Sequence, residues 1–455
     1  MQTHPFPRTR MHLAALLAVG LLALVLLPGA ALAQQGQGRS AAARAGDAVP
    51  ERYIVTLTPG AAASAVARAH AVVPTAAFNR AFTGFVAIVP EGRLNALRRD
   101  PRVEAVVPDR VIWPMPGRPG KPKRSGASTG SETVPSGVQR IGAAPAASLG
   151  VTGVGVGVAV LDTGVDRAHV DLRVGAACFD AFGGDCADRD GHGTHVAGTI
   201  AALANGVGVV GAAPGATIYA VKVLDGEQGG SDAALLAGIE WVLENAARVS
   251  PPIRVVNMSL GRPGGVDDNP ALRSAVDALL AAGLVLVAAA GNDPTRSATD
   301  QIPAAYPDAI TVAATTALPG TDACPARGEP IGADTLAFFT SYTPPTNGSG
   351  VDLSAPGERR ENIGASCVVD GEGILSLYPG DALAEMSGSS MAAPLVSGVA
   401  ALLLERAPGL APSQVAAAIR NGATNPASGP FPAVISNQRA TGGILSAPGA
   451  LALLP

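Results

Sequence analysis

The stretch Gly388-Ser389-Ser390-Met391-Ala392-Ala393-Pro394 is a turn of small residues that leads directly into an apolar run, residues 395–404. The run predicts a buried helix with Ser390 in its first turn. A hydroxyl in that place lies beside the free N–H groups of a helix start, which favour negative charge. These are the properties of a nucleophile with half of an oxyanion hole attached. An ordinary serine cap on a core helix is the alternative, and only residues elsewhere in the chain can exclude it.

Upstream of this turn, short apolar runs alternate with helical patterns. The runs cover residues 156–161, 218–224, 253–258, 284–289 and 309–313. Their near-continuous Val, Ile and Ala content is typical of parallel strands buried on both faces. Between them, Ser231 is the predicted N-cap of one helix, and Asn269-Pro270 begins another that ends at Gly283. The pattern predicts an α/β fold with a doubly wound, mainly parallel sheet, helices on both faces and a ligand site beyond the carboxyl ends of the strands.

The first 33 residues have the organisation of a secretory signal peptide. Arg8 and Arg10 precede an apolar run, residues 13–27, and Ala31-Leu32-Ala33 forms a cleavage site. Because the apolar run is shorter than the about 20 residues that span a bilayer, cleavage is favoured over a membrane anchor. We therefore expect an exported protein, extracellular or periplasmic, with no membrane attachment after cleavage.

The rest of the chain divides into four parts by composition and periodicity. Residues 34–50 form a connector without periodicity. In residues 51–112, three strand-like runs alternate with two helical runs, which predicts a small α+β domain of the ferredoxin-like type. Residues 113–131 are rich in Pro, Gly, Lys and Arg, so we expect a cleavable linker. Residues 132–455 form the main α/β domain.

Charge and cysteine content limit the function classes. The formal net charge of −4 gives no reason to expect a nucleic-acid partner or an anionic membrane surface. Four cysteines in an exported chain fit two disulfides, for which three pairings exist. We favour 178–186, which are close in sequence, and 324–367, which lie in two Gly- and Pro-rich stretches. The spacing lacks a Cys-x-x-Cys pair, so a zinc site is disfavoured.

Three element ends carry an acid, an imidazole and a hydroxyl. Asp162 follows the apolar strand 158–161, His192 opens a helix, and Ser390 opens another. A serine hydroxyl becomes a useful nucleophile only when a base removes its proton. An imidazole does so near neutral pH when a carboxylate holds its other nitrogen. Each residue alone has a plain explanation as a cap or turn residue, but the three together indicate acyl transfer.

The motifs around these residues are specific. Asp162-Thr163-Gly164, residues 192–199 (HGTHVAGT) and residues 388–394 (GSSMAAP) resemble, in order, the three signatures of the subtilisin-like serine proteases, the subtilase or S8 peptidase family. The resemblance extends from about residue 134 to the end of the chain, with Ser389 where the family usually has Thr. It implies that Asp162 orients the general base His192 and that Ser390 attacks the peptide carbonyl. His195 is then a structural histidine that points inward.

The resemblance also implies an oxyanion hole and a substrate groove. Asn292 would donate its side-chain amide to the oxyanion, beside the backbone N–H of Ser390, and a turn Asn is the alternative. The segment Ser259, Leu260 and Gly261 would pair with the substrate as an added strand, with residues 225–231 as the opposite wall. The loop 293–302 would line the pocket for the residue before the scissile bond. Asp300 in this loop is consistent with a pocket that prefers a basic residue. An ordinary exposed polar loop is an equally good interpretation.

Residues 202–211 resemble the calcium loop of the family. The resemblance implies structural Ca²⁺ and no organic cofactor. The implied oxygen ligands come from two carboxylates, one side-chain amide and three backbone carbonyls: Glu132, Asp171, Asn205, Leu203, Val207 and Val209. Such a set suits a hard cation. A Gly-rich turn between a helix and a strand is the alternative.

The small domain resembles the inhibitor-type propeptide of the family, in residues 82–85 and 100–104. The predicted function is therefore an exported serine endopeptidase that cleaves polypeptide substrates through an acyl-enzyme. It is made as a self-processing zymogen with its propeptide as intramolecular inhibitor and folding template, and we expect a monomer. A catalytically silent binding protein is disfavoured because the triad and Asn292 are all present. Acyl transfer to an acceptor other than water is disfavoured because we expect no further domain after the peptidase domain.

Overall fold

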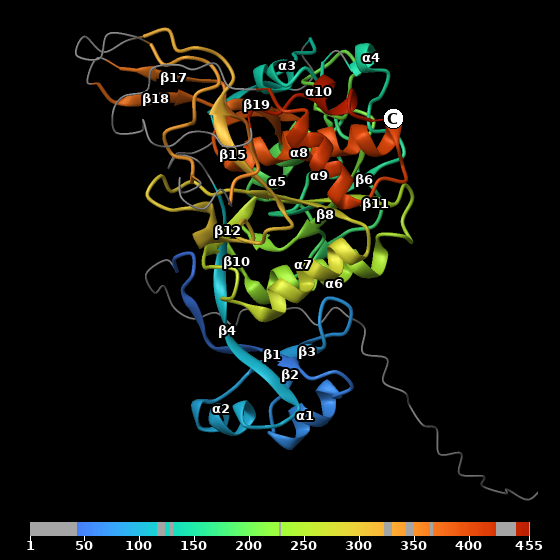
Figure 1. The fold of residues 1–455 in the computed structure, drawn as a ribbon, viewed down its shortest axis with the longest axis vertical. Coiled ribbons are helices and arrows are strands. Elements are labelled where there is room, and N and C mark those ends of the chain that lie inside the picture. The colour runs from blue at the N-terminus through green and yellow to red at the C-terminus, as the bar shows by residue number, and fades with distance from the viewer. Residues whose placement is uncertain are drawn as a thin grey trace, which may run out of the picture.

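The computed structural model describes residues 43–115, 123–127, 131–144, 146–226, 229–322, 330–342, 350–364, 367–424 and 443–454. The predicted signal peptide and most of the predicted connector lie outside this part of the chain. Among the helices within it, none is both long and apolar enough to cross a membrane. Two bodies are visible in Figure 1: an N-terminal unit (residues 43–115, blue) and a larger main domain (residues 131–454).

The N-terminal unit is a four-stranded antiparallel sheet with two helices, in the strand order β4-β1-β3-β2. Its elements are β1 (Ala48–Leu57), α1 (Ala63–Ala69), β2 (Pro74–Phe78), β3 (Gly84–Ile88), α2 (Glu91–Arg98) and β4 (Val103–Pro114). Leu94 and Leu97, three residues apart on α2, are buried against the sheet in one apolar cluster with Val55 and Phe85. This small core is separate from the two larger apolar cores, one of which also contains Ile54, Phe78, Phe82 and Val86 of the N-terminal unit.

Strand β4 differs most from its prediction, because the run 103–107 continues for seven more residues to Pro114. Its first half pairs with β1 inside the N-terminal unit, where Val107 lies opposite Ile54. Its second half leaves that sheet and pairs with strands β10 (Gly229–Ser231) and β12 (Leu260–Pro263) of the main domain. The predicted linker therefore begins as a strand. Residues 123–127 within it form a second strand, β5 (Lys123–Ala127), on the hairpin β19 (Ile374–Tyr378) and β20 (Ala382–Met386).

The main domain contains a seven-stranded, all-parallel sheet in the order β16-β15-β13-β11-β6-β8-β7. Its strands are β6 (Gly157–Asp162), β7 (Phe179–Asp180), β8 (Thr217–Lys222), β11 (Ile253–Met258), β13 (Val285–Ala289), β15 (Ile310–Thr316) and β16 (Leu353–Glu358). The predicted α/β fold with a mainly parallel sheet is confirmed.

Helices cover both faces of this sheet, and β6 shows how the sequence directs them. Val158 and Val160 face the core that contains α5 (His192–Ala201), α8 (Ser389–Arg406) and α9 (Pro412–Asn421). Ala159 and Leu161 face the opposite core, with α6 (Asp232–Asn245) and α7 (Pro270–Ala281). Alternating side chains of one strand thus enter two apolar layers, which explains why the strand has no polar residue before Asp162.

The predicted starts of α6 and α7 are confirmed. Ser231 caps α6 by accepting the N–H of Ala234, and Asn269 caps α7 by accepting the N–H of Leu272. The remaining elements are short: α3 (Ser136–Arg140), α4 (Ala146–Leu149), β9 (Leu224–Asp225), the 3-10 turn Ala298–Asp300, β14 (Gln301–Ile302), β17 (Arg360–Ile363), β18 (Val369–Glu372) and α10 (Ala447–Leu451).

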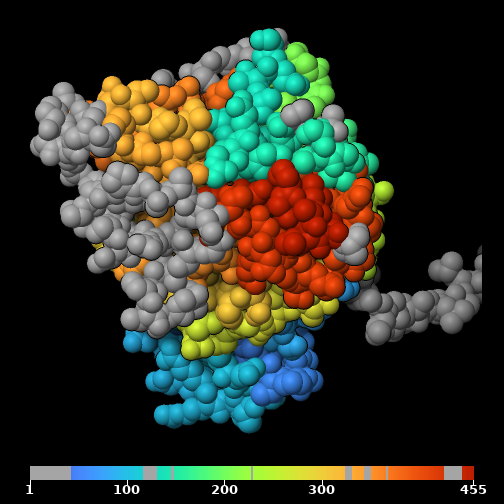
Figure 2. All heavy atoms as spheres, turned by 45° about the horizontal axis from the view of Figure 1, so that its top comes forward, coloured from blue at the N-terminus to red at the C-terminus, as the bar shows by residue number. Residues whose placement is uncertain are grey.

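The predicted disulfide between Cys178 and Cys186 is confirmed, with an S–S distance of 2.10 Å. Cys367 is also disulfide-bonded. Its predicted partner, Cys324, lies outside the described residues. Figure 2 shows the N-terminal unit packed against the yellow-green surface of the main domain, the part of the chain that contains α6 and α7.

Candidate active site

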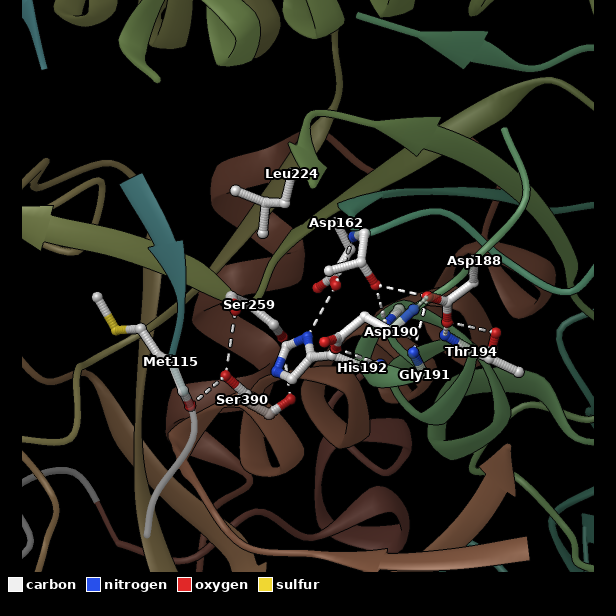
Figure 3. A network of polar contacts seen from close by, with 12 residues as sticks. Met115, Asp162, Asp188, Asp190, Gly191, His192, Thr194, Leu224, Ser259 and Ser390 are labelled. Atoms are coloured by element: carbon white, nitrogen blue, oxygen red, sulfur yellow. Dashed lines mark hydrogen bonds and ion pairs between the residues drawn. The ribbon is translucent and has the colours of Figure 1, made fainter. Parts of the chain in front are cut away.

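Asp162 and His192 meet because α5 begins very close to the turn that follows β6. A Cβ atom at Gly193 would lie 2.1 Å from the carbonyl oxygen of Gly164, so only glycine permits this approach. Nδ1 of His192 lies 2.7 Å from Oδ1 of Asp162, and both side chains are buried. With Nδ1–H donated to the carboxylate, the lone pair of the neutral ring is on Nε2. This atom is buried and has no hydrogen-bond partner among the residues that the structure describes. In Figure 3 the ring lies between Asp162 and Ser390.

The charges around His192 favour its protonated form. Burial is the largest single effect and lowers the pKa of the imidazole, whereas the Asp162 carboxylate, with further contributions from Asp190 and Asp188, raises it. The net effect is a pKa above the ordinary value of histidine. The ring is therefore a stronger base than free imidazole in the place where a proton has to be taken from a hydroxyl.

Asp188, for which we made no prediction, holds these two elements in place. Its Oδ1 accepts the hydroxyl of Thr163 at 2.9 Å, and its Oδ2 accepts the N–H and the hydroxyl of Thr194 at 2.8 and 2.6 Å. The Thr163 hydroxyl accepts the N–H of Gly193 at 2.9 Å. One buried carboxylate therefore links the turn after Asp162 to the first turn of the His192 helix, as Figure 3 shows in part.

Ser390 lies in the first turn of α8, after Gly388, whose φ of 153° is a conformation that glycine adopts readily. Its Oγ lies 2.6 Å from the carbonyl oxygen of Met115 and 3.1 Å from that of Ser259. Pro394, four residues further along, has no N–H to donate to the carbonyl of Ser390. That carbonyl instead accepts a hydrogen bond from the hydroxyl of Ser259 at 2.9 Å, which links the turn to the residue directly before β12.

The side-chain amide of Asn292 points at the same carbonyl as Ser390. Its Nδ2 donates to the carbonyl oxygen of Met115. Its Oδ1 accepts the backbone N–H of Ser389 at 2.8 Å, which fixes the orientation of the amide. The Ser389 hydroxyl accepts the N–H of Gly291 at 3.2 Å, so the hydroxyl that replaces the expected Thr also has a partner. A carbonyl oxygen between a serine hydroxyl and an amide donor has the surroundings of a substrate carbonyl about to be attacked.

The segment Ser259, Leu260 and Gly261 pairs with the end of β4. Leu260 lies opposite Pro114 and Gly261 opposite Trp113, and the N–H of Met115 lies 3.3 Å from the carbonyl oxygen of Ser259. A Cβ atom at Gly261 would lie 2.0 Å from Cε of Met115, so glycine leaves the space that this side chain fills. Strand β10 pairs with the other edge of β4, where Gly230 lies opposite Ile112. The chain therefore binds its own residues 111–115 as an extended strand between two walls, in the manner of β-strand addition.

Two carboxylates reinforce the contact between the N-terminal unit and α6. Glu240 of α6 accepts the backbone N–H groups of Asn79, Arg80 and Ala81 at 2.7–3.2 Å. Asp109 of β4 accepts the N–H of Ala233, in the first turn of α6, at 2.9 Å. Burial raises the pKa of Asp109 to about 6. Each unit thus supplies a carboxylate that accepts backbone N–H groups of the other unit.

His195 is fully buried, and its Nε2 lies 3.0 Å from the carbonyl oxygen of Ile374 and 3.2 Å from that of Ala384. Burial lowers its pKa to about 3, which keeps the ring neutral. These contacts attach α5 to the β19–β20 hairpin and fit the predicted structural role. In the loop 293–302, Asp300 is exposed at the end of the 3-10 turn. The apolar side chain of Met115 is buried beside Gly261.

The residues of the predicted calcium loop come together at one place. Asp171 accepts the side-chain amide of Asn205 at 3.0 Å and the N–H of Val209 at 3.1 Å. Glu132 accepts the N–H of Gly206 at 2.8 Å. Burial raises the pKa of Asp171 to about 6, and the charge of Glu132 acts in the same direction. In the described part of the chain, no three or more His, Cys, Asp or Glu side chains form a metal-binding group. Asn205 turns its amide nitrogen to Asp171, while its Oδ1 accepts the N–H of Val207 at 3.1 Å. The two carboxylates are ligands that calcium prefers, but the Asn205 amide would have to turn to offer its oxygen to an ion.

Two participants of this site, Met115 and Asp188, were not predicted from the sequence. Met115 lies in a Pro-rich stretch and is recognisable only from the pairing of β4 with the main domain. Asp188 precedes the helix of His192 by four residues, too far to be its N-cap, so no capping pattern identifies it.

Comparisons with known proteins identify the family of the chain. Residues 153–443 match the Subtilase family, Peptidase_S8. Subtilisin DY of Bacillus licheniformis is 37% identical over 298 residues, which cover 65% of this chain and 93% of that protein. Subtilisin NAT of Bacillus subtilis subsp. natto is 35% identical over 342 residues, or 74% of each chain.

Among solved structures, fervidolysin from Fervidobacterium pennivorans, a keratinolytic enzyme related to subtilisin, has a TM-score of 0.65 at 23% identity. The match covers 92% of this chain and 62% of that one, and it concerns the fold alone. Taken with the family match over residues 153–443, these similarities assign the chain to the subtilase family of serine endopeptidases.

Proposed function

We propose that the protein is an exported endopeptidase in which Asp162, His192 and Ser390 form the catalytic triad. The observation that carries the proposal is the carbonyl of Met115, which lies against the Ser390 hydroxyl and the Asn292 amide while its strand pairs with β10 and β12. A peptide held in this way has its carbonyl at the nucleophile and its flanking residues fixed by main-chain pairing.

In the proposed reaction, Nε2 of His192 takes the hydroxyl proton of Ser390 while Oγ bonds to the carbonyl carbon. The Asp162 carboxylate stabilises the imidazolium that forms. Negative charge develops on the carbonyl oxygen, where the amide of Asn292 and the backbone N–H of Ser390 receive it. His192 then gives the proton to the leaving nitrogen, the C–N bond breaks, and a water molecule hydrolyses the acyl-enzyme by the same steps.

We further propose that residues 43–115 are an inhibitory prosegment and that the chain processes itself after Met115. This position falls inside the stretch in which the sequence predicts cleavage. The 2.6 Å approach of Ser390 Oγ to the Met115 carbonyl oxygen supports it, as do the carboxylates Glu240 and Asp109, which reinforce the contact. Export is proposed from the signal-peptide pattern of residues 1–33.

A structural calcium ion is part of the proposal. Glu132 and Asp171 would supply carboxylate oxygens, Asn205 its amide oxygen, and three backbone carbonyls the rest: Leu203, Val207 and Val209. The ion would add folding stability to the loop that joins α5 to β8. It takes no part in the chemistry proposed for Ser390.

A fluorophosphonate probe tests the triad directly. Purified protein should be labelled and should hydrolyse a peptide substrate, whereas Ser390→Ala should do neither and should keep its N-terminal unit attached. Ser446→Ala is the matched control, because Ser446 caps α10 by accepting the N–H of Gly449 and has no contact with the site among the described residues. Unlabelled wild-type protein, or a Ser390→Ala precursor that still matures when purified alone, contradicts the proposal. The first result would favour a silent binding protein.

A further inference from the structure

The main domain contains a single lysine, and this lysine is buried beside the proposed triad. Every other Lys or Arg position in residues 132–455 holds arginine, whereas Lys222 is only 5% exposed. Lysine is almost never fully buried unless its ammonium group has partners. The contacts of this ammonium group show what it holds in place.

Lys222 and Asp162 end neighbouring strands of the parallel sheet. Lys222 is the last residue of β8 and lies opposite Asp162, the last residue of β6. The backbone N–H of Val223 donates to the carbonyl oxygen of Asp162 at 2.9 Å. Nζ of Lys222 donates to two backbone carbonyl oxygens, that of Thr163 at 2.5 Å and that of Leu224 at 3.0 Å. The ammonium group thus joins the turn that follows Asp162 to the segment that follows β8.

Thr163 transmits this contact to the Asp162 carboxylate. The N–H of Thr163 donates to Oδ1 of Asp162 at 2.7 Å, and the same oxygen accepts Nδ1–H of His192. The Thr163 hydroxyl is bonded to Asp188, and the Thr163 carbonyl is bonded to Lys222. The backbone N–H that orients the Asp162 carboxylate toward His192 is therefore fixed from two sides.

The second carbonyl that Lys222 holds belongs to a wall of the groove. Leu224 lies in β9, opposite Gly230 of β10. Gly230 in turn lies opposite Ile112 of the strand in the groove. A Cβ atom at Gly230 would lie 2.2 Å from the carbonyl oxygen of Val223, so the wall packs directly on the residue after Lys222. One ammonium group therefore links the wall that pairs with a bound peptide to the turn that carries the acid of the triad.

We propose that Lys222 is a positioning residue that acts on the triad through the backbone of Thr163. The proposal rests on the proposed endopeptidase function. Hydrogen bonds from a charged donor are about twice as strong as those between neutral groups, so the ammonium group holds the Thr163 carbonyl more firmly than a neutral donor would. Without it, the Asp162 carboxylate would lose its fixed direction toward His192. A misplacement of about 1 Å at a catalytic group costs about 10²-fold in rate.

The test compares Lys222→Met with wild-type enzyme on two substrates. Methionine keeps the length and apolar body of the side chain but has no ammonium group. The N-terminal unit is removed with tagged wild-type enzyme, which is then withdrawn, and active sites are counted with a fluorophosphonate. One substrate is a peptide long enough to pair with β10 and β12, and the other is p-nitrophenyl acetate, which is too short to reach either wall. Lys222→Met should lower the turnover of both about 10²-fold.

A spectroscopic measurement separates positioning from a loss of stability. The low-field ¹H resonance of Nδ1–H of His192 reports the hydrogen bond to the acid of the triad, and it should shift in Lys222→Met. Arg254→Met is the matched control for both measurements. Arg254 is also a basic residue on a strand of the parallel sheet, and it donates to two backbone carbonyl oxygens, those of Pro408 and Leu410, at 2.8 and 3.3 Å. Its replacement should change neither turnover nor the resonance.

If Lys222→Met does not fold, Lys222→Gln supplies a neutral donor of similar length, and ester turnover should still fall at least about fivefold. Ester turnover per active site that equals the wild-type value in either active variant overturns the inference, as does a loss confined to the KM of the peptide. An unshifted resonance in a variant with slower ester turnover overturns it too. Wild-type enzyme that cleaves neither substrate and is not labelled by a fluorophosphonate contradicts the endopeptidase function itself.

Discussion

The side-chain amide of Asn292 donates to the carbonyl oxygen of Met115, which lies 177 positions earlier in the chain. The donor and the acceptor belong to different bodies of the molecule, so the groove of the main domain is filled by the chain itself. An amide whose other end is fixed by the N–H of Ser389 is oriented before any substrate arrives.

Asn292→Ala should lower kcat by about 10²–10³, because the variant loses a donor to the developing oxyanion while keeping the triad. The measurement is kcat and KM on a peptide substrate with titrated enzyme. Asn245→Ala is the control, since the Asn245 amide donates to the carbonyl oxygen of Trp241 on α6, away from the site. A rise in KM with kcat unchanged would falsify the oxyanion role.

Pro116 follows Met115 in the sequence, so the leaving group of the proposed processing step is a proline nitrogen. That nitrogen carries a ring carbon where other residues carry a hydrogen, which crowds the proton transfer from His192. Pro116→Ala should therefore speed self-processing by at least about tenfold, or ~1.4 kcal/mol of barrier. The rate is measured by the appearance of the mature band, with Pro119→Ala as control. Equal rates for the two variants would show that the bond after Met115 does not limit maturation.

Asp190→Asn should move the acid limb of the kcat/KM profile to lower pH. Activity requires the neutral imidazole of His192, whose pKa is raised in part by the Asp190 charge. Removing that charge lowers the pKa, so the neutral form persists in more acidic solution. The Asn side-chain oxygen can still accept the backbone N–H of His192, as Asp190 Oδ1 does at 3.2 Å. Asp277→Asn, on the exposed face of α7, is the control, and an acid limb that stays in place speaks against the charge effect.

Glu240→Ala should loosen the N-terminal unit, because three backbone N–H groups lose their charged acceptor. In an uncleaved Ser390→Ala background, amide exchange of residues 79–81 should rise by about 30-fold, corresponding to ~2 kcal/mol. Glu244→Ala on the same helix is the control, because its pair with Arg80 at 3.6 Å is partly exposed. If the amides of residues 79–81 exchange as slowly in Glu240→Ala as in the parent protein, the apolar contacts alone hold the two bodies together.

Calcium should stabilise the protein mainly above about pH 6. Burial raises the pKa of Asp171 to about 6 in the metal-free protein, above the value of about 3.9 in an unfolded chain. Between these values the unfolded chain binds fewer protons than the folded one, so metal-free stability falls as pH rises and stays low above pH 6. A bound cation favours the carboxylate and offsets this loss.

Thermal unfolding with Ca²⁺ or EDTA checks this expectation. At pH 7 chelation should lower Tm, and the difference should shrink towards pH 4. Asp171→Asn should remove the effect, whereas Asp277→Asn should retain it. Identical midpoints with Ca²⁺ and EDTA at pH 7 contradict the site.

The sequence predicted the parallel sheet because each buried strand is apolar on both faces, as in residues 158–161. It placed Asp162, His192 and Ser390 in one site because polar residues at strand and helix ends meet at one edge of such a sheet. The second half of β4 could not be predicted in this way. Its pairing partners, Gly230 and Leu260, lie more than a hundred residues further on, and Pro108 and Pro114 suggest a break within the strand itself. Strand β2 was missed because Ala76 and Ala77 have little strand propensity.

Strand β4 pairs with strands of both bodies, so the N-terminal unit fixes which residue of β4 lies beside Ser390. Val107 is held opposite Ile54 in one sheet, and Ile112 is held opposite Gly230 in the groove. Sliding the strand by one residue would turn its buried side chains outward, and sliding it by two would break the pairing with β1. The number of residues between the two sheets therefore selects the peptide bond that reaches Ser390. Inserting two residues directly after Arg110 would therefore bring a peptide bond two positions nearer the N-terminus to Ser390. No residue of the active site would change.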